Sequence, residues 1–224
     1  MAGALAVAVV LAVPGAAGAS VASPIRAVFL KEFSKPSYQM SRGQLLVFEN
    51  DDPFLIHGLG GALVAARALP GETRLVRNSP YLAPGNYPFN DPFHPEMASV
   101  LTVTAGGTPP PPDVAAPAGP VRLLATTARR VAKTGQVRVR VIPSEAVDVD
   151  LNLFVGKTKL ASGSGTLTDA VPGVLAVSLP PPARKQVHPG TVLSLRAKLI
   201  DVTGKLTKKR TARRVGGGGG GKGK

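Results

Sequence analysis

The second half of the chain alternates apolar and polar residues with a period of two, the pattern of half-buried β-strands. The alternation is clearest in four stretches, at residues 136–142, 147–155, 174–179 and 191–201. Turn signals rich in glycine, serine and proline separate them, at residues 134–135, 162–165 and 189–190. Seven or so short strands with regular turns predict a β-sandwich in this half of the chain.

The first half contains short strand-like runs, at residues 25–30, 44–50 and 98–104. Turn signals recur at residues 41–43, 69–71 and 83–85. Helical periodicity is weak, and its best window, residues 60–69, opens with two glycines, so we expect a loop or a single turn there. These runs predict an antiparallel β-sandwich of about 80 residues. The whole protein is therefore expected to be all-β.

Composition divides the chain into five regions. Four consecutive prolines between the two sandwiches cannot donate to a sheet ladder, which predicts a semi-rigid spacer and a domain boundary. The glycine run near the end has no apolar period and predicts a disordered basic tail. The expected regions are a leader at 1–19, a first domain at 25–104, a spacer at 105–120, a second domain at 121–215 and a tail at 216–224.

The N-terminus predicts export. Residues Ala4 to Val13 form an apolar run that is too short to span a bilayer, and no Lys or Arg precedes it. Ala17-Gly18-Ala19 offers the small residues that signal peptidase recognises, so cleavage is expected after Ala19, with Ala22 as the alternative. We expect no transmembrane span and a mature protein that is extracellular, wall-associated or periplasmic.

The 224 residues include no cysteine, which excludes disulfides, thiolate metal sites and cysteine nucleophiles. Aromatic residues make up only 4%, so the cores must consist mainly of aliphatic side chains. Residues 25–104 contain seven basic and seven acidic residues, whereas the second half carries the whole net charge of +14. A cationic second half favours anionic partners such as cell-wall polymers. Export and the few aromatic residues weigh against nucleic acid.

One motif stands out in the first half. The sequence YPFNDPFHPEM, from Tyr87 to Met97, follows an earlier FENDDPFLIH, which ends at His57. Together with Pro84, Gly85, Leu101 and Val103, these motifs resemble the cupredoxin family of plastocyanin- and pseudoazurin-like domains. The resemblance covers about residues 25–104 and implies a Greek-key sandwich with a copper site. Its ligands would be His57, position 91, His94 and an axial Met97.

Two residues depart from the cupredoxin pattern: Asp91 replaces the cysteine ligand, and Ser99 replaces a glycine. A blue-copper site needs the thiolate, because the copper–thiolate bond provides its colour and its electronic route. A carboxylate at this position favours Cu(II) or Zn(II) and disfavours Cu(I). We therefore expect a non-blue His57, Asp91 and His94 site with Met97 more distant, and at most a vestigial electron-transfer role with a redox or copper-delivery partner.

Each of these residues also has an ordinary interpretation. Asp91 is a good turn former between Asn90 and Pro92, and Met97 suits core packing. A cupredoxin-shaped domain without any metal is therefore the alternative, and the protein would then be a structural or adhesive envelope protein. His188 is expected in a turn. The chain contains no enzyme motif such as G-x-S-x-G with a partner histidine, so we expect no enzymatic activity.

The second domain weakly resembles bacterial modules of the immunoglobulin or fibronectin-III type. The resemblance rests on the strand pattern and on residues 193–205, which are similar to a closing A-x-D-x-x-G-N segment with Lys205 in place of the asparagine. Arg138 and Arg140 are expected on one strand face, where solvation alone would explain them. The resemblance implies a second sandwich but no particular ligand.

Overall fold

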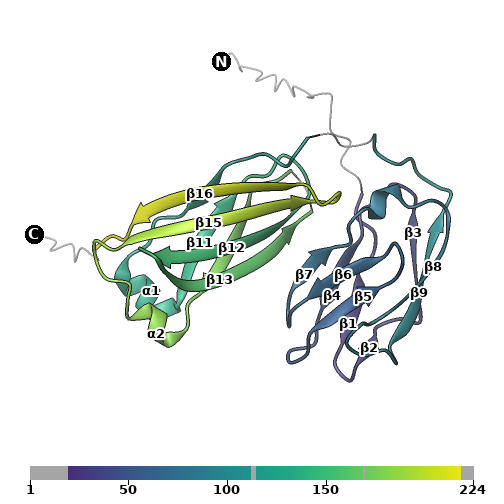
Figure 1. The fold of residues 1–224 in the computed structure, drawn as a ribbon, viewed down its shortest axis with the longest axis horizontal. Coiled ribbons are helices and arrows are strands. Elements are labelled where there is room, and N and C mark those ends of the chain that lie inside the picture. The colour runs from purple at the N-terminus through teal and green to yellow at the C-terminus, as the bar shows by residue number, and fades with distance from the viewer. Residues whose placement is uncertain (1–19, 112–114, 169, 218–224) are drawn as a thin grey trace, which may run out of the picture.

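A computed structural model describes residues 20–111, 115–168 and 170–217, and these form two β-sandwiches (Figure 1). The expected all-β class is confirmed. The predicted leader and residues 218–224 of the predicted tail lie outside the described residues. Within the described part of the chain, no helix is long and apolar enough to cross a membrane.

The first sandwich consists of two sheets. One has the order β2-β1-β4-β7, with β1 at Ile25–Val28, β2 at Glu32–Phe33, β4 at Val47–Asn50 and β7 at Thr73–Leu75. The other has the order β3-β9-β8-β5-β6, with β3 at Ser37–Ser41, β5 at His57–Gly60, β6 at Ala65–Ala68, β8 at Gly85–Asn90 and β9 at Ala98–Thr104. A short 3₁₀ helix, Ser79–Tyr81, follows β7.

The alternating residues of these strands bury one face of each sheet. Phe48, Ile25 and Leu101 are fully buried in the shared core, and Tyr38 and Phe89 contribute its aromatic rings. The expectation of a purely antiparallel sandwich is wrong in two places, because β1 pairs with β4 and β3 pairs with β9 in parallel. The chain changes sheets between these strands, so they return in the same direction.

The second sandwich also has two sheets. The smaller has the order β10-β11-β14, with β10 at Val121–Leu123, β11 at Gln136–Val141 and β14 at Gly173–Ser178. The larger has the order β13-β12-β15-β16, with β12 at Val147–Val155, β13 at Thr158–Leu167, β15 at Val192–Asp201 and β16 at Leu206–Arg214. Valine and leucine side chains from both sheets form its core. Its assignment to the immunoglobulin or fibronectin-III type stays a prediction.

The expected turn at residues 162–165 is wrong. This Ser-Gly-Ser-Gly segment lies inside β13 and pairs with β12 along its length. The glycines are explained by close packing against β14. A Cβ at Gly165 would lie 2.7 Å from a side-chain carbon of Leu175, and one at Gly163 would lie 3.2 Å from the carbonyl oxygen of Ala176.

Three further elements differ from the expectations. Residues 60–69 include the strand β6 rather than only a loop or turn. A helix α1, Ala128–Thr134, was not expected; Thr127 caps its start and Gly135 ends it at φ 64°. Strand β16 has no apolar period, yet it pairs with β15 along its length. Gly216, expected in the tail, exchanges backbone hydrogen bonds with Thr126 and Ala128.

The two sandwiches pack against each other through β7. Arg74 binds Asp150 at 3.2 Å, and the backbone N–H of Leu75 donates to Asp148. The hydroxyl of Thr166 lies 2.7 Å from the carbonyl oxygen of Thr73. A small apolar cluster of Leu45, Val47 and Leu75 with Ala146 and Val202 completes the contact. The proline spacer therefore links two bodies that are also joined by direct contacts.

Candidate metal centre

The loop before β5 positions His57 through two buried polar residues. The side-chain amide of Asn50 donates to the carbonyl oxygens of Leu55 and Ala68, and its own oxygen accepts from the N–H of Asp52. Asp52 in turn accepts from the N–H groups of Phe54 and Leu55. These bonds fix the loop that leads into His57, which is fully buried at the start of the strand.

Asp91 and His94 belong to the loop between β8 and β9. The N–H of Asp91 donates to the carbonyl oxygen of Met97, and the N–H of His94 donates to the carbonyl oxygen of Asp91. The Asp91 Oδ1 atom accepts from the N–H of Phe93 at 2.9 Å, as in an ordinary aspartate turn. Asp91 is fully buried. Its second oxygen, Oδ2, points toward the histidines.

Close packing brings this loop onto β5. A Cβ at Gly60 would lie 2.9 Å from Cγ of Pro92, and one at Gly58 would lie 3.2 Å from Cδ of the same proline. Side chains at these two positions of β5 would therefore push the loop away. The absence of side chains at positions 58 and 60 lets Asp91 and His94 approach His57.

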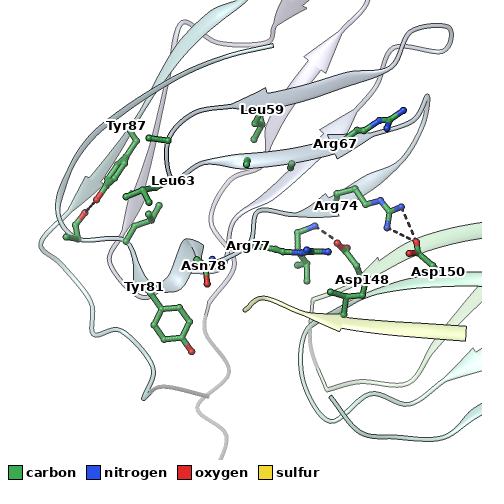
Figure 2. A pocket seen from close by; sticks show the side chains of 17 residues that line it. Leu59, Leu63, Arg67, Arg74, Arg77, Asn78, Tyr81, Tyr87, Asp148 and Asp150 are labelled. Carbon is green, nitrogen blue, oxygen red and sulfur yellow. Dashed lines mark hydrogen bonds and ion pairs between the residues drawn. The ribbon is translucent and has the colours of Figure 1, made fainter. Parts of the chain in front are cut away.

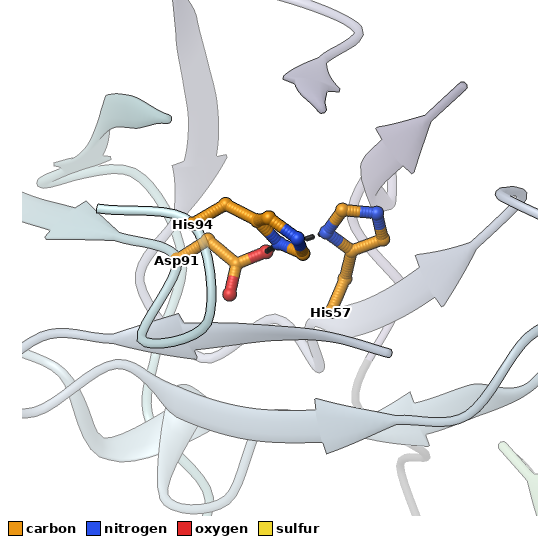
Figure 3. A group of neighbouring side chains, drawn as sticks. All are labelled: His57, Asp91 and His94. Atoms are coloured by element: carbon orange, nitrogen blue, oxygen red, sulfur yellow. Dashed lines mark hydrogen bonds and ion pairs between the residues drawn. The ribbon is translucent and has the colours of Figure 1, made fainter. Parts of the chain in front are cut away.

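The three side chains converge on one point (Figure 3). Oδ2 of Asp91 lies 2.5 Å from Nδ1 of His57 and 3.3 Å from Nδ1 of His94. The two imidazole rings are 4.8 Å apart between centroids and inclined at 44°. One ligand atom from each of the three residues lies within 4.8 Å of the others. His94 keeps 13% of its side chain exposed, so solvent reaches the site at this residue.

The donor set suits a divalent ion of the nitrogen- and oxygen-preferring kind. Ligand atoms about 2.0–2.1 Å from one tetrahedral ion lie roughly 3.3 Å apart. The distance from His94 to Asp91 already has this value. The distance from His57 to Asp91 is that of a hydrogen bond, so it must lengthen by about 0.8 Å, and the proton between the two atoms must leave.

Met97, the expected axial ligand, is buried in the core of the first sandwich at 4% exposure. Its backbone closes the metal-site loop through hydrogen bonds to Asp91 and His94. Core packing and loop closure account for a methionine here. Its role as a distant axial ligand stays a prediction. His188 lies in an exposed turn of the second sandwich, as expected, with its N–H donating to Thr191 Oγ1.

Sequence reasoning missed the role of Asp52. Its Oδ2 lies 3.5 Å from Nε2 of His57, opposite the nitrogen that faces Asp91, and both side chains are buried. Burial by itself raises the pKa of Asp52, but the N–H groups of Phe54 and Leu55 and the neighbouring His57 outweigh this effect, so the pKa is lowered. Asp52 is therefore held as a carboxylate. The segment FENDDPFLIH contained this residue without showing that it orients the histidine.

A second concave site lies between the two sandwiches (Figure 2). This cavity has a volume of about 890 Å³, and its lining includes Leu59, Tyr87, Arg77 and the interface pair of Arg74 and Asp150. None of its lining residues is His57, Asp91 or His94. It is therefore separate from the candidate metal centre.

Comparisons with known proteins yield partial similarities. No protein-family model matches the chain, and no curated protein matches it. A purple cupredoxin from Nitrosopumilus maritimus is 16% identical, with a TM-score of 0.32, over 37% of this chain and 99% of that chain. A mutant amicyanin in the Cu(I) form is 15% identical, with a TM-score of 0.28, over 40% of this chain and 86% of its own.

A further solved structure is similar over most of the chain, so that this similarity includes the second sandwich. A Ca²⁺-stabilised, ice-binding adhesin of an Antarctic bacterium is 11% identical, with a TM-score of 0.32, over 88% of this chain and 49% of that chain. Similarities this low carry no argument about what the chain binds.

Proposed function

We propose that the protein binds one divalent copper ion through His57, Asp91 and His94. The observation that carries this proposal is the convergence of both imidazole Nδ1 atoms on the same carboxylate oxygen of Asp91. The imidazole nitrogens are borderline donors and the carboxylate oxygen is a hard donor, so a bound Cu(II) or Zn(II) ion would be favoured over Cu(I). The chemistry of the bound ion would be that of a non-blue centre. The role we propose is copper binding or storage, with at most slow electron transfer to a redox or copper-delivery partner.

The residues in and around the site have different roles in binding the ion. Asp52 accepts from Nε2 of His57 and so leaves the Nδ1 lone pair for the ion. Asp91 supplies the only negative charge among the three ligands and replaces the charge of the missing thiolate. His94 is the partly exposed ligand and provides the path of entry.

We also propose that the protein is exported and begins at Ser20. Val21 bridges to Leu45, the N–H of Ala22 donates to the carbonyl oxygen of Leu45, and Ala22 is buried. Cleavage after Ala22 would remove these contacts, which favours cleavage after Ala19. N-terminal sequencing of secreted protein tests this, and an intact Met1 would contradict it.

Copper titration tests the metal site directly. We expect the wild-type chain to bind about one Cu(II), with weak colour and a large copper hyperfine splitting, because an oxygen ligand delocalises the unpaired electron less than a thiolate. His57→Ala and His94→Ala should each remove most of the binding. His188→Ala, in an exposed turn of the other sandwich, is the matched control and should bind as the wild type does.

The variant Asp91→Cys tests the position of the ligands. It places a thiolate between the two histidines, so Cu(II) should produce an intense visible charge-transfer band and a narrowed hyperfine splitting. Circular dichroism must first show that the variant folds, because it loses the bond from Phe93 to Oδ1. A folded variant that stays colourless, with a wild type that takes up no copper, would support the alternative of a metal-free envelope protein.

A further inference from the structure

The larger sheet of the second sandwich carries a row of basic residues on its outer face. The leucines of β12 and β15 and the valines of β12 point into the core, so the residues between them point outward. The register of β15 with β16 places Arg196 opposite Arg210 and Lys198 opposite Lys208. Together with two further exposed residues they form the cationic face: Lys159, Arg196, Lys198, Lys208, Arg210 and Arg214.

Two acidic residues on this sheet face lie toward the first sandwich and are already bound, although one of them, Asp150, is directly opposite Lys198. Asp148 and Asp150 alternate with core residues of β12, so they share the outer face. Asp150 forms an ion pair with Arg74 of the first sandwich, and Asp148 accepts from the N–H of Leu75 and the hydroxyl of Thr166. Packing of the first sandwich therefore covers the acidic end of the face and leaves the cationic end exposed.

The cations of this face are little compensated: Lys198 lies opposite Asp150, but that carboxylate is paired with Arg74. Directly opposed like charges on neighbouring strands have Cβ atoms about 4.5–5.5 Å apart and destabilise a sheet. This face contains two such pairs side by side, Arg196 with Arg210 and Lys198 with Lys208. Among the described residues, none of its six cations forms an ion pair. A charged edge strand protects against aggregation, but that explains β16 and not the matching cations on β15.

The spacing of the charges suits an extended polyanion. Successive outward residues on one strand lie about 6.6–6.8 Å apart, so the face presents cations at regular intervals along and across the strands. Two shallow hollows, of about 380 and 300 Å³, flank them. Asn152, Ser162 and Ser194 line these hollows and offer neutral hydrogen-bonding groups beside the cations. The smaller hollow is also lined by Glu72 and Asp150, whose carboxylates are paired with Arg74.

We propose that the cationic face binds an anionic polysaccharide. Acidic groups of such a chain would contact the arginines and lysines, and its hydroxyls would meet the serine and asparagine side chains. Nucleic acid fits less well, because the one aromatic ring on the face, Phe154, is covered by the guanidinium of Arg196 at 4.5 Å and is not available for base stacking. This inference goes beyond copper binding and does not depend on it.

The experiment measures binding of the full mature chain to fluorescent heparin as the probe, between 50 and 300 mM salt. The face variant is Arg196→Gln, Lys198→Gln, Lys208→Gln and Arg210→Gln combined. The matched control removes four exposed cations elsewhere in the same sandwich, by Arg122→Gln, Arg129→Gln, Arg138→Gln and Arg140→Gln. Both variants lose four charges, and circular dichroism checks that both fold.

We expect the face variant to bind at least about 30-fold more weakly than the wild type near 0.1 M salt, with the slope of log K against log salt reduced by about 3. The control should change the affinity by less than about threefold. Equal losses in the two variants would contradict the assignment to this face, as would a wild type that does not bind heparin. Tighter binding to duplex DNA than to heparin at equal charge would overturn the choice of polysaccharide.

Discussion

Asp91 uses its two carboxylate oxygens in two different ways. Oδ1 accepts from the N–H of Phe93 and stabilises the loop, while Oδ2 contacts both histidines. The turn-forming and ligand interpretations of this residue are therefore compatible. A buried carboxylate is costly without a partner, and here the partner is a protonated nitrogen of His57 or, on our proposal, a metal ion in place of that proton.

The first prediction concerns Asp52→Asn. Oδ1 can still accept from Phe54 and Leu55, but an amide NH₂ in place of Oδ2 faces the N–H at Nε2 of His57, and two donors then oppose each other. The tautomer that leaves Nδ1 open is disfavoured, so copper affinity should fall about 10- to 100-fold. Competition with a chelator measures this. Asp51→Asn, at an exposed neighbour 3.9 Å from Arg26, is the control, and an equal loss in both would argue against an orienting role.

The hairpin of β15 and β16 shows how an element depends on one buried side chain. Asp201 is fully buried at the end of β15, and its Oδ1 accepts from the N–H and hydroxyl of Thr203 and from the N–H of Lys205. In the part of the chain that the structure describes, its other oxygen, Oδ2, has no hydrogen-bond partner. One carboxylate oxygen therefore accepts all three of these bonds in the turn, beside the backbone bonds of Asp201 with Gly204 and Lys205.

The second prediction separates the two oxygens of Asp201. Asp201→Ala removes three hydrogen bonds and leaves partly buried donors unsatisfied, so the free energy of unfolding should fall by about 2–4 kcal/mol. Asp201→Asn keeps Oδ1 and replaces only the unpaired oxygen, so it should retain most of the stability. Urea unfolding at neutral pH measures both. If Asn proves as damaging as Ala, the carboxylate charge rather than the bonds at Oδ1 stabilises the turn.

At the scale of the whole molecule, the contact between the two sandwiches contains a buried titratable side chain, Asp148. Burial raises the pKa of Asp148, and the hydrogen bonds from Thr166 and Leu75 and the charges of Arg74 and Arg77 only partly offset it. The single hydroxyl hydrogen of Thr166 has two acceptors, Asp148 Oδ1 at 2.6 Å and the carbonyl oxygen of Thr73 at 2.7 Å. A protonated Asp148 can donate to Thr166, which can then donate to Thr73, and both contacts are satisfied.

The third prediction follows from the sign of this shift. The folded chain holds the proton of Asp148 more tightly than the unfolded chain does, so its contribution to stability is complete at low pH. That contribution is lost as the pH rises from about 4, the ordinary value for aspartate, through the raised pKa. Asp148→Asn keeps a neutral donor, so its stability relative to the wild type should increase from pH 4 to pH 7. Urea unfolding across this pH range measures the difference in stability. Asp150→Asn is the control. Parallel curves of unfolding free energy against pH for Asp148→Asn and the wild type would contradict the prediction.

The sequence by itself determined the all-β class and the positions of several core strands, because alternation in a single strand is a local property. It also indicated which side chains are candidates for the metal site, since His57, Asp91 and His94 occur in motifs of fixed local spacing. It could not reveal β16, because an edge strand with cations on its outer face needs no apolar period. It misjudged residues 162–165, where the glycines reflect close packing against β14.

Only the tertiary structure decided which atoms meet. The sequence separation between Asp52, His57 and Asp91 does not indicate that two carboxylates face opposite nitrogens of one imidazole; the packing of Pro92 against Gly58 and Gly60 brings them together. Likewise the charges of the second half became a cationic face only through strand register and through Arg74, which covers the acidic end. Such contacts join residues far apart in the chain, and a local pattern carries no information about them.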